Sequence, residues 1–389
     1  MSRLPSDFTL LQVTPALDTG GVEQTTLDIA SAVTRAGGRA LVASFGGRLE
    51  GALAEVGGEL IRLPVQSKNP ATMLANASKL RKVIREAGVS IVHVRSRAPA
   101  FAALWAARES KVPLVATYHG VYNAKTAPKR WYNAVMTRGD LVIANSDYTR
   151  AHVLAQHHVD PAKVLAIPRG VNLARFDPEA VSPERIAAVR AGWGLAEDDK
   201  RAVILCAARL TRWKGQGLLV AAAQRLKARG EGGFVVILAG DDQGREGYRA
   251  ELEAAIAAAG LEGEVKMPGH CEDMPAAYMA ADIAVAPSLE PEAFGRTAVE
   301  PQAMRRPVVA AAHGAALETV VEGETGWLAA PGDARAWADA LSVALTAGPS
   351  RLAAMGAKGR ARAQALYSVE RMAGATLDAY SDLLARWRP

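Results

Sequence analysis

The stretch IAVAPSLEPEAFGRTAVE, residues 283–300, passes from a short buried strand through a loop into a helix. Residues 283–286 form a continuous apolar run, which is typical of a parallel strand covered on both faces. A loop rich in Pro, Ser, Glu and Gly follows, and the helix that it opens carries Glu300. In α/β sheets such a loop lies at the carboxyl end of its strand, where ligands bind and where helix N–H groups attract phosphate.

The same alternation of apolar runs and helical patterns extends over most of the chain. In the first half the runs fall at residues 9–14, 40–44, 60–64, 91–94, 114–117, 141–144 and 164–167, and in the second half at 202–207, 234–239, 264–267, 283–286, 308–311 and 326–328. A polar stretch at 177–183 separates the two series. We therefore predict two α/β domains, each a doubly wound parallel sheet, at residues 1–180 and 196–365, followed by a helical segment at 366–389.

Length and composition narrow the class of protein. The chain of 389 residues is long enough for two domains, and its hydrophobic share of 50% excludes a disordered chain. Two cysteines provide neither a disulfide framework nor a cysteine zinc site. No apolar run reaches the roughly 18 residues of a membrane-spanning helix, and the first residues lack the pattern of a secretory leader. A cytoplasmic location is the expectation.

Basic residues are concentrated in the first half of the chain. The first 180 residues hold 22 Lys and Arg against 14 Asp and Glu, whereas the remainder holds 24 against 26. Such an excess favours an anionic partner, either a membrane surface, a phosphorylated lipid or nucleic acid, although a solvated basic surface gives the same pattern. No motif that reads bases accompanies the charge, so a nucleic-acid partner is not expected.

Three positions in the first half follow predicted strands. Gly20 and Gly21 open a helix after the first strand, where they allow a phosphate or sugar to approach the backbone or form a plain turn. Their spacing differs from the G-x-G-x-x-G dinucleotide fingerprint, which argues against a nicotinamide cofactor. His119 follows the strand at 114–117, where it can hydrogen-bond a sugar hydroxyl or serve as an ordinary loop histidine.

The second half places charged groups at two strand ends. Arg209 and Lys214 follow the strand at 202–207, and cations there suit a diphosphate, although a solvated basic loop is the alternative. Glu292 and Glu300 are eight residues apart, about two helical turns, so they lie along one face. One carboxylate can therefore reach a sugar and the other a ribose.

Glu292 and Glu300, with Phe294 and Gly295 between them, resemble the E-x7-E motif of retaining glycosyltransferases with the GT-B fold, in particular family 4 of the glycosyltransferases. Further stretches agree with this family in the same order: Gly20-Gly21, 117–120, 144–146, 168–172, Arg209 with Lys214, 239–241, 307–310, Glu318 and 323–326. The resemblance implies two Rossmann-like domains that face each other across a cleft, with the acceptor domain first and the nucleotide-sugar domain second. It also implies a C-terminal helix that crosses back to the first domain.

The resemblance implies roles by position. The implied catalytic residues are His119, Glu292, Arg209 and Lys214. The residues implied to bind the donor nucleotide sugar are Gly20, Gly21, Arg209, Lys214, Gly240, Met267, Glu292, Phe294, Gly295, Arg296 and Glu300. Within this set, Arg209 and Lys214 match the diphosphate pair and Glu300 matches the acid that holds the ribose. Glu292 and His119 match groups near the transferred sugar, and the nucleobase would lie against the backbone of 266–270.

The implied reaction is retaining and independent of metal or any other cofactor. No two aspartates lie two positions apart, so the Asp-x-Asp metal site of the other main glycosyltransferase fold is absent from the sequence. Cations and the helix dipole would stabilise the departing nucleoside diphosphate, while the acceptor attacks from the front face and a donor phosphate oxygen takes its proton. No nucleophile is assigned, since Glu292 lacks the paired carboxylic acid that glycosidase chemistry requires.

The expected acceptor is a glycan or glycolipid at a membrane. Basic and aromatic residues interleave after His119, which fits an anionic membrane surface or phosphorylated lipid as well as a solvated helix. The candidate acceptor residues are Arg95, Arg97, Tyr122 and Lys125, and residues 117–150 resemble bacterial transferases that build lipopolysaccharide core or other surface glycans.

The leading hypothesis is therefore a hexosyltransferase that uses a UDP- or GDP-sugar and contacts the inner membrane surface peripherally. The alternative is a nucleotide-sugar epimerase of the same architecture, which would convert the donor without any acceptor.

Overall fold

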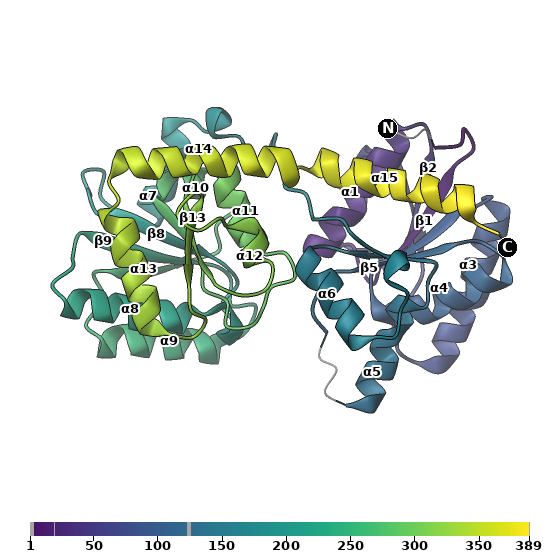
Figure 1. Cartoon of the computed structure of the whole chain (residues 1–389), viewed down its shortest axis with the longest axis horizontal. Helices are drawn as coiled ribbons and strands as arrows, with labels where there is room; N and C mark the ends of the chain where they lie inside the picture. The colour runs from purple at the N-terminus through teal and green to yellow at the C-terminus, as the bar shows by residue number, and fades with distance from the viewer. Residues whose placement is uncertain (1–3, 19, 123–125, 389) are drawn as a thin grey trace. The chain divides into compact units, whose positions relative to one another are not determined.

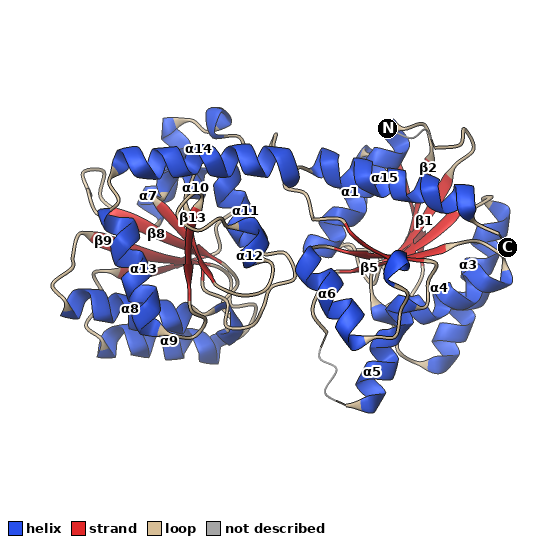
Figure 2. Cartoon of the chain, viewed as in Figure 1, coloured by secondary structure: helices blue, strands red, loops and turns tan. Residues whose placement is uncertain are grey.

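The computed structural model describes residues 4–18, 20–122 and 126–388, and the chain divides into two compact units. Unit 1 comprises Met1–Gly170 and Val369–Pro389, and unit 2 comprises Val171–Ser368. Each unit is an open parallel sheet with helices on both faces (Figure 1, Figure 2). The predicted fold of two doubly wound α/β domains is confirmed.

The sheet of unit 1 has seven strands in the order β3-β2-β1-β4-β5-β6-β7, and all the pairings are parallel. The strands are β1 (Thr9–Val13), β2 (Arg39–Ser44), β3 (Gly58–Arg62), β4 (Ile91–Val94), β5 (Leu114–Tyr118), β6 (Leu141–Ala144) and β7 (Val164–Ala166). The helices are α1 (Gly21–Arg35), α2 (Glu50–Glu55), α3 (Pro70–Glu86), α4 (Arg97–Glu109), α5 (Ala127–Asn133), α6 (Asp147–Gln156) and α15 (Val369–Arg386), with short 3-10 helices at Ala134–Thr137 and Pro161–Lys163. The strand order reverses between β1 and β4, and the carboxyl ends at such a reversal are where α/β sheets bind ligands.

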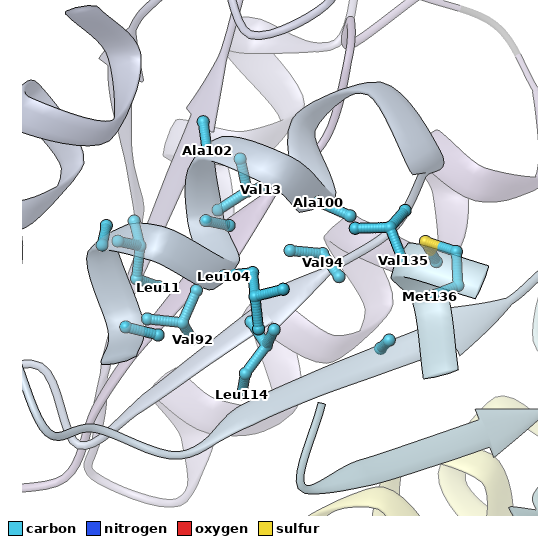
Figure 3. Close-up of a cluster of buried hydrophobic side chains, with 14 of the residues drawn as sticks. Leu11, Val13, Val92, Val94, Ala100, Ala102, Leu104, Leu114, Val135 and Met136 are labelled. Carbon is cyan, nitrogen blue, oxygen red and sulfur yellow. The ribbon is translucent and has the colours of Figure 1, made fainter. Parts of the chain in front are cut away.

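Each face of this sheet has its own core, because successive side chains of a strand point to opposite faces. Leu11 and Val92 pack beneath α4, in the cluster drawn in Figure 3. Their neighbours Leu10 and Ile91 pack on the other face, with α1 and α15. The continuous apolar runs of the sequence follow from this arrangement, because both faces of the sheet are buried.

The sheet of unit 2 has six parallel strands in the order β10-β9-β8-β11-β12-β13. The strands are β8 (Ala202–Ala207), β9 (Phe234–Ala239), β10 (Val265–Gly269), β11 (Ile283–Ala286), β12 (Val308–Ala311) and β13 (Gly326–Ala329). The helices are α7 (Pro183–Gly192), α8 (Gln216–Ala228), α9 (Glu246–Ala258), α10 (Met274–Ala280), α11 (Arg296–Ala303), α12 (Ala316–Thr319), α13 (Ala334–Thr346) and α14 (Pro349–Leu366), with 3-10 helices at Pro178–Ala180 and Arg212–Lys214. Here the order reverses between β8 and β11.

The division between the units falls ten residues before the predicted boundary at 180. Val171 and Phe176 are buried in the core of unit 2, and the backbone N–H of Val171 donates to the carbonyl of Tyr367 at 2.7 Å. Residues 171–180 therefore pack as part of unit 2. The C-terminal helix α15 belongs to unit 1, where it contacts α1 and places Tyr380 in the core.

Candidate functional site

The loops after β8 and β11 come together in unit 2, on either side of the strand-order reversal. Gly215 ends the first loop with φ +78°, and a Cβ atom there would lie 2.0 Å from the carbonyl oxygen of Pro287. Only glycine permits this approach, because a side chain would collide with the second loop and disfavour the positive φ. The close packing fixes the position of Lys214 relative to the β11 loop.

Lys214 and Glu292 form the centre of this site. The ammonium nitrogen of Lys214 lies 2.7 Å from Oε1 of Glu292, and both side chains are largely buried. The hydroxyl of Ser288 donates to the same carboxylate oxygen, and His313 donates from Nε2 to the carbonyl of Ser288 at 2.8 Å. Glu292, Ser288 and His313 line a small open pocket, whose remaining walls are Ala286, Gly295, Ala298, Ala311 and Ala316.

Glu300 occupies the second position of the acidic pair, on helix α11. Its carboxylate is 2.6 Å from a guanidinium nitrogen of Arg296 and accepts a hydrogen bond from the Tyr278 hydroxyl at 3.2 Å. Burial, and then the neighbouring Glu300 carboxylate, hold the pKa of Tyr278 well above its usual range, so the tyrosine remains a hydrogen-bond donor. The carboxylate is thus fixed in direction, with a residue exposure of only 8%.

The other residues predicted for the donor have distinct surroundings. Arg209 donates to the Oε1 of Gln243 at 3.2 Å, and Gly240 lies so close to the Ala208 carbonyl that a Cβ would stand 1.9 Å from it. The side chain of Phe294 is buried and packs edge-on against Tyr367, so it anchors the loop while its backbone amide leads into α11. Met267 lies half-buried in β10, at the edge of the sheet.

In unit 1 the glycine turn and His119 are linked by Arg169, which follows β7. A guanidinium nitrogen of Arg169 lies 2.8 Å from Nδ1 of His119, and another would lie 2.5 Å from a Cβ placed on Gly21. The carboxylate of Glu23 lies against Gly20, at the N-terminus of α1 where an anion is favoured. Burial, followed by Arg169, lowers the pKa of His119 well below its usual value.

The acceptor candidates separate into a buried and a partly exposed residue. Arg95 is 2% exposed, its guanidinium donates to the Oε1 of Gln12, and burial lowers its pKa to about 10. Arg97 stacks on Tyr122, with 3.9 Å from its guanidinium carbon to the ring centre, and donates to Asn133 at 2.8 Å. Lys125 lies outside the described residues.

Several residues that our sequence analysis assigned no role take part in these arrangements: Arg169, Tyr278, Ser288 and His313. Arg169 and Ser288 stood inside stretches already linked to the motif, but no pattern indicated their partners. Tyr278 lies on α10 and His313 follows β12, and only the fold brings Tyr278 to Glu300 and His313 to the Ser288 carbonyl.

Two further findings concern the described part of the chain. No group of three or more His, Cys, Asp and Glu side chains there is arranged to hold a metal ion. Across the same residues, every helix is too short or too polar to pass through a lipid bilayer.

Known protein families match both halves of the chain. The family described as Glycosyl transferases group 1 matches residues 192–362, and the family described as Glycosyltransferase Family 4 matches residues 19–175. The D-inositol 3-phosphate glycosyltransferase of Kineococcus radiotolerans is 34% identical over 295 residues, which are 69% of this chain and 66% of that protein. The match thus spans about two thirds of that relative's length.

Solved structures extend the likeness to nearly the whole chain. A glycosyltransferase from Rickettsia africae is 32% identical with a TM-score of 0.90, covering 98% of this chain and 99% of that one. HepE from Anabaena in complex with UDP-glucose is 25% identical with a TM-score of 0.82, covering 96% and 100%. Fold and sequence together define a glycosyltransferase of the GT-B class. Within this class, the chain belongs to the family of group 1 and family 4 glycosyltransferases.

Proposed function

We propose that this chain transfers a hexose from UDP-sugar to a hydroxyl group of a phosphate-bearing acceptor, with retention of anomeric configuration and without a metal ion. The observation that carries the proposal is a pair of acidic side chains in unit 2, each held by an ion pair. Glu292 pairs with Lys214, and Glu300 pairs with Arg296. Uridine is the proposed base because the solved relative HepE, 25% identical, holds UDP-glucose. A GDP-sugar is the second donor to be tested.

The proposed chemistry places positive charge where the leaving group develops its negative charge. Arg209 and Lys214 would bind the diphosphate, and the N-terminus of α11 adds its dipole, so these groups supply the electrostatic stabilisation that a divalent metal provides elsewhere. Lys214 forms an ion pair with Glu292 in the free protein. Donor binding would therefore move the Lys214 ammonium group towards the phosphate. Glu292 would then accept a hydrogen bond from the transferred sugar, and Glu300 one from the ribose.

The proposed acceptor carries a phosphate, for two reasons. The excess of positive charge lies in the first 180 residues, and the Kineococcus relative is a D-inositol 3-phosphate glycosyltransferase. Phosphate can belong to a small polyol or to a membrane-associated glycan, including a lipopolysaccharide core, which our sequence analysis favoured. The enzyme would meet the second kind of acceptor at the inner membrane surface.

A transfer assay with labelled UDP-hexoses tests the proposal. The protein is incubated with a soluble inositol phosphate in one arm and with glycolipid vesicles in the other, each with Mg²⁺ and with EDTA. We expect product in one acceptor arm, undiminished by EDTA, and loss of product in Lys214→Met. Interconversion of the donor sugar without any acceptor would instead establish the epimerase alternative.

A further inference from the structure

His119, Arg169 and Gly21 form a cluster in unit 1, and the proposed donor chemistry gives Arg169 no role in it. The three residues follow β5, β7 and β1, so the sheet brings their strand ends together. Arg169 lies against the backbone of Gly21 and reaches Nδ1 of His119 at 2.8 Å. A side chain on Gly21 would displace the Arg169 guanidinium. Its Cβ would lie 2.5 Å from the guanidinium nitrogen that does not contact His119.

The contact with Arg169 determines which ring nitrogen of His119 carries hydrogen. A guanidinium has only donors, so Nδ1 must accept, and a neutral imidazole that accepts at Nδ1 holds its proton on Nε2. The ionisable groups that interact electrostatically with the His119 ring are Arg169, Arg95 and His93. The Tyr122 hydroxyl is hydrogen-bonded to the backbone of His119 and not to its ring. These groups supply no negative charge, so nothing among them favours the imidazolium form.

The Nε2 atom of His119 is buried, and within the described ranges no protein group accepts its hydrogen. Buried donors are normally paired, so an unpaired one marks a place for a missing acceptor. We propose that Arg169 is a positioning residue that holds His119 in the neutral Nε2–H form, so that His119 donates a hydrogen bond to a substrate oxygen and does not act as a general base. The inference rests on the proposed function for the nature of that substrate.

Nitrogen NMR of the intact protein, labelled at its seven histidines, tests the tautomer without any substrate. His119 is assigned by the loss of its signals in His119→Gln. We expect an unprotonated Nδ1 and a protonated Nε2 that do not change between pH 5.5 and pH 8. A proton on Nδ1, or titration near the ordinary histidine pKa, would overturn the proposal.

Variants of Arg169 test whether this residue sets the tautomer. In Arg169→Met the His119 signals should begin to titrate or show both tautomers, whereas Arg169→Lys, which retains a cationic donor, should preserve the wild-type pattern. Gly21→Ala should reproduce the Met variant, because it pushes the guanidinium away. Arg108→Met, which alters an exposed arginine on α4, is the matched control. An unchanged His119 spectrum in Arg169→Met would show that Arg169 has no positioning role.

Activity with UDP-sugar then tests the donor role of Nε2. His119→Ala should lower kcat on the order of 10²-fold with little change in KM, and His119→Gln should recover most of this loss because its amide still donates. Arg169→Met should lose activity as the pH falls, while Arg169→Lys stays flat. Full activity of His119→Ala contradicts the inference. If wild type binds no UDP-sugar, the proposed function fails, but the NMR result still decides the tautomer.

Discussion

At the residue scale, the two neighbours of Glu300 fix the direction of its carboxylate and so limit what it can bind. Arg296 holds one carboxylate oxygen and Tyr278 the other, so the side chain cannot rotate freely to meet a ligand. A fixed carboxylate suits a pair of vicinal hydroxyls, which can donate to it without reorganisation. A hydrogen bond to a charged group contributes about 1.5–3 kcal/mol, which corresponds to roughly ten- to a hundredfold in affinity.

Glu300→Gln should therefore weaken UDP binding by at least about tenfold in calorimetric titration, because the amide removes the charge while keeping the shape. Glu253→Gln, on the exposed surface of α9, is the control and should bind like wild type. Equal affinities for UDP in wild type and Glu300→Gln would exclude Glu300 as a nucleotide contact.

The acidic and basic residues of this site could be predicted from the sequence, but their pairing could not. Glu292 and Lys214 are 78 positions apart, and their 2.7 Å contact depends on the packing of Gly215 against Pro287. Arg95 followed a predicted strand end, as expected, but the structure buries its guanidinium against Gln12. The direction of a side chain at a strand end follows from the pleat and from its neighbours, which a local pattern does not contain.

At the element scale, the loop between β8 and α8 depends on one glycine. Gly215→Ala forces a Cβ into the Pro287 carbonyl at a positive φ, and such strain costs on the order of 1–3 kcal/mol. We expect lower stability in urea unfolding together with weaker UDP binding, since Lys214 precedes this residue. Gly217→Ala is the matched control, because a Cβ there would make only an ordinary 4.0 Å contact with Leu252 and alanine favours helix. Wild-type stability of Gly215→Ala would refute the packing argument.

Helix α15 is held to the sheet of unit 1 by a buried polar contact. The Tyr380 hydroxyl bonds to Nδ1 of His93 at 2.5 Å, and Nε2 of His93 meets the Thr117 hydroxyl at 2.7 Å. Tyr380→Phe leaves a buried ring nitrogen unpaired, which costs about 1–3 kcal/mol. Urea unfolding should show this loss of stability. The loss caused by Tyr380→Phe should differ between the wild-type and the Thr117→Val background, because the two contacts share one imidazole. Strict additivity would argue against a coupled network.

At the scale of the whole molecule, most of the fold followed from the sequence because both faces of each sheet are covered. Continuous apolar runs such as 114–117 and 283–286 are typical of buried strands, and each coincides with a strand to within a residue. The break between α14 and α15 lies next to residue 366, where we placed the start of the C-terminal helical segment, but no pattern in the sequence indicated what causes it. It occurs where the backbone of 367–368 pairs with Val171, a contact almost 200 residues away in the chain.

Buried histidines should make the protein sensitive to acid. Burial lowers the pKa of His93 and of His119 well below that of an unfolded histidine, about 6.5. Below pH 6.5 the unfolded chain therefore binds protons that the folded chain does not. The free energy of unfolding should fall with decreasing pH by up to about 1.4 kcal/mol per unit for each histidine.

Urea unfolding between pH 7.5 and 5.5 checks this slope. His93→Gln should reduce the pH dependence, whereas His158→Gln, an exposed substitution on the same unit, should leave it unchanged. The same slope in wild type and His93→Gln would contradict the assignment of a neutral buried His93.

The most direct test of the central claim is thermal unfolding of the purified protein with UDP, GDP and ADP and their sugars. A ligand bound only by the folded state stabilises it, by about 2.7 kcal/mol at a hundredfold excess over its Kd. We predict a clear rise in Tm with UDP and UDP-sugars, a smaller one or none with GDP and ADP, and no rise with UDP in Lys214→Met. No rise with any nucleotide, or an equal rise in wild type and Lys214→Met, would contradict the assignment of unit 2 as a UDP-sugar site.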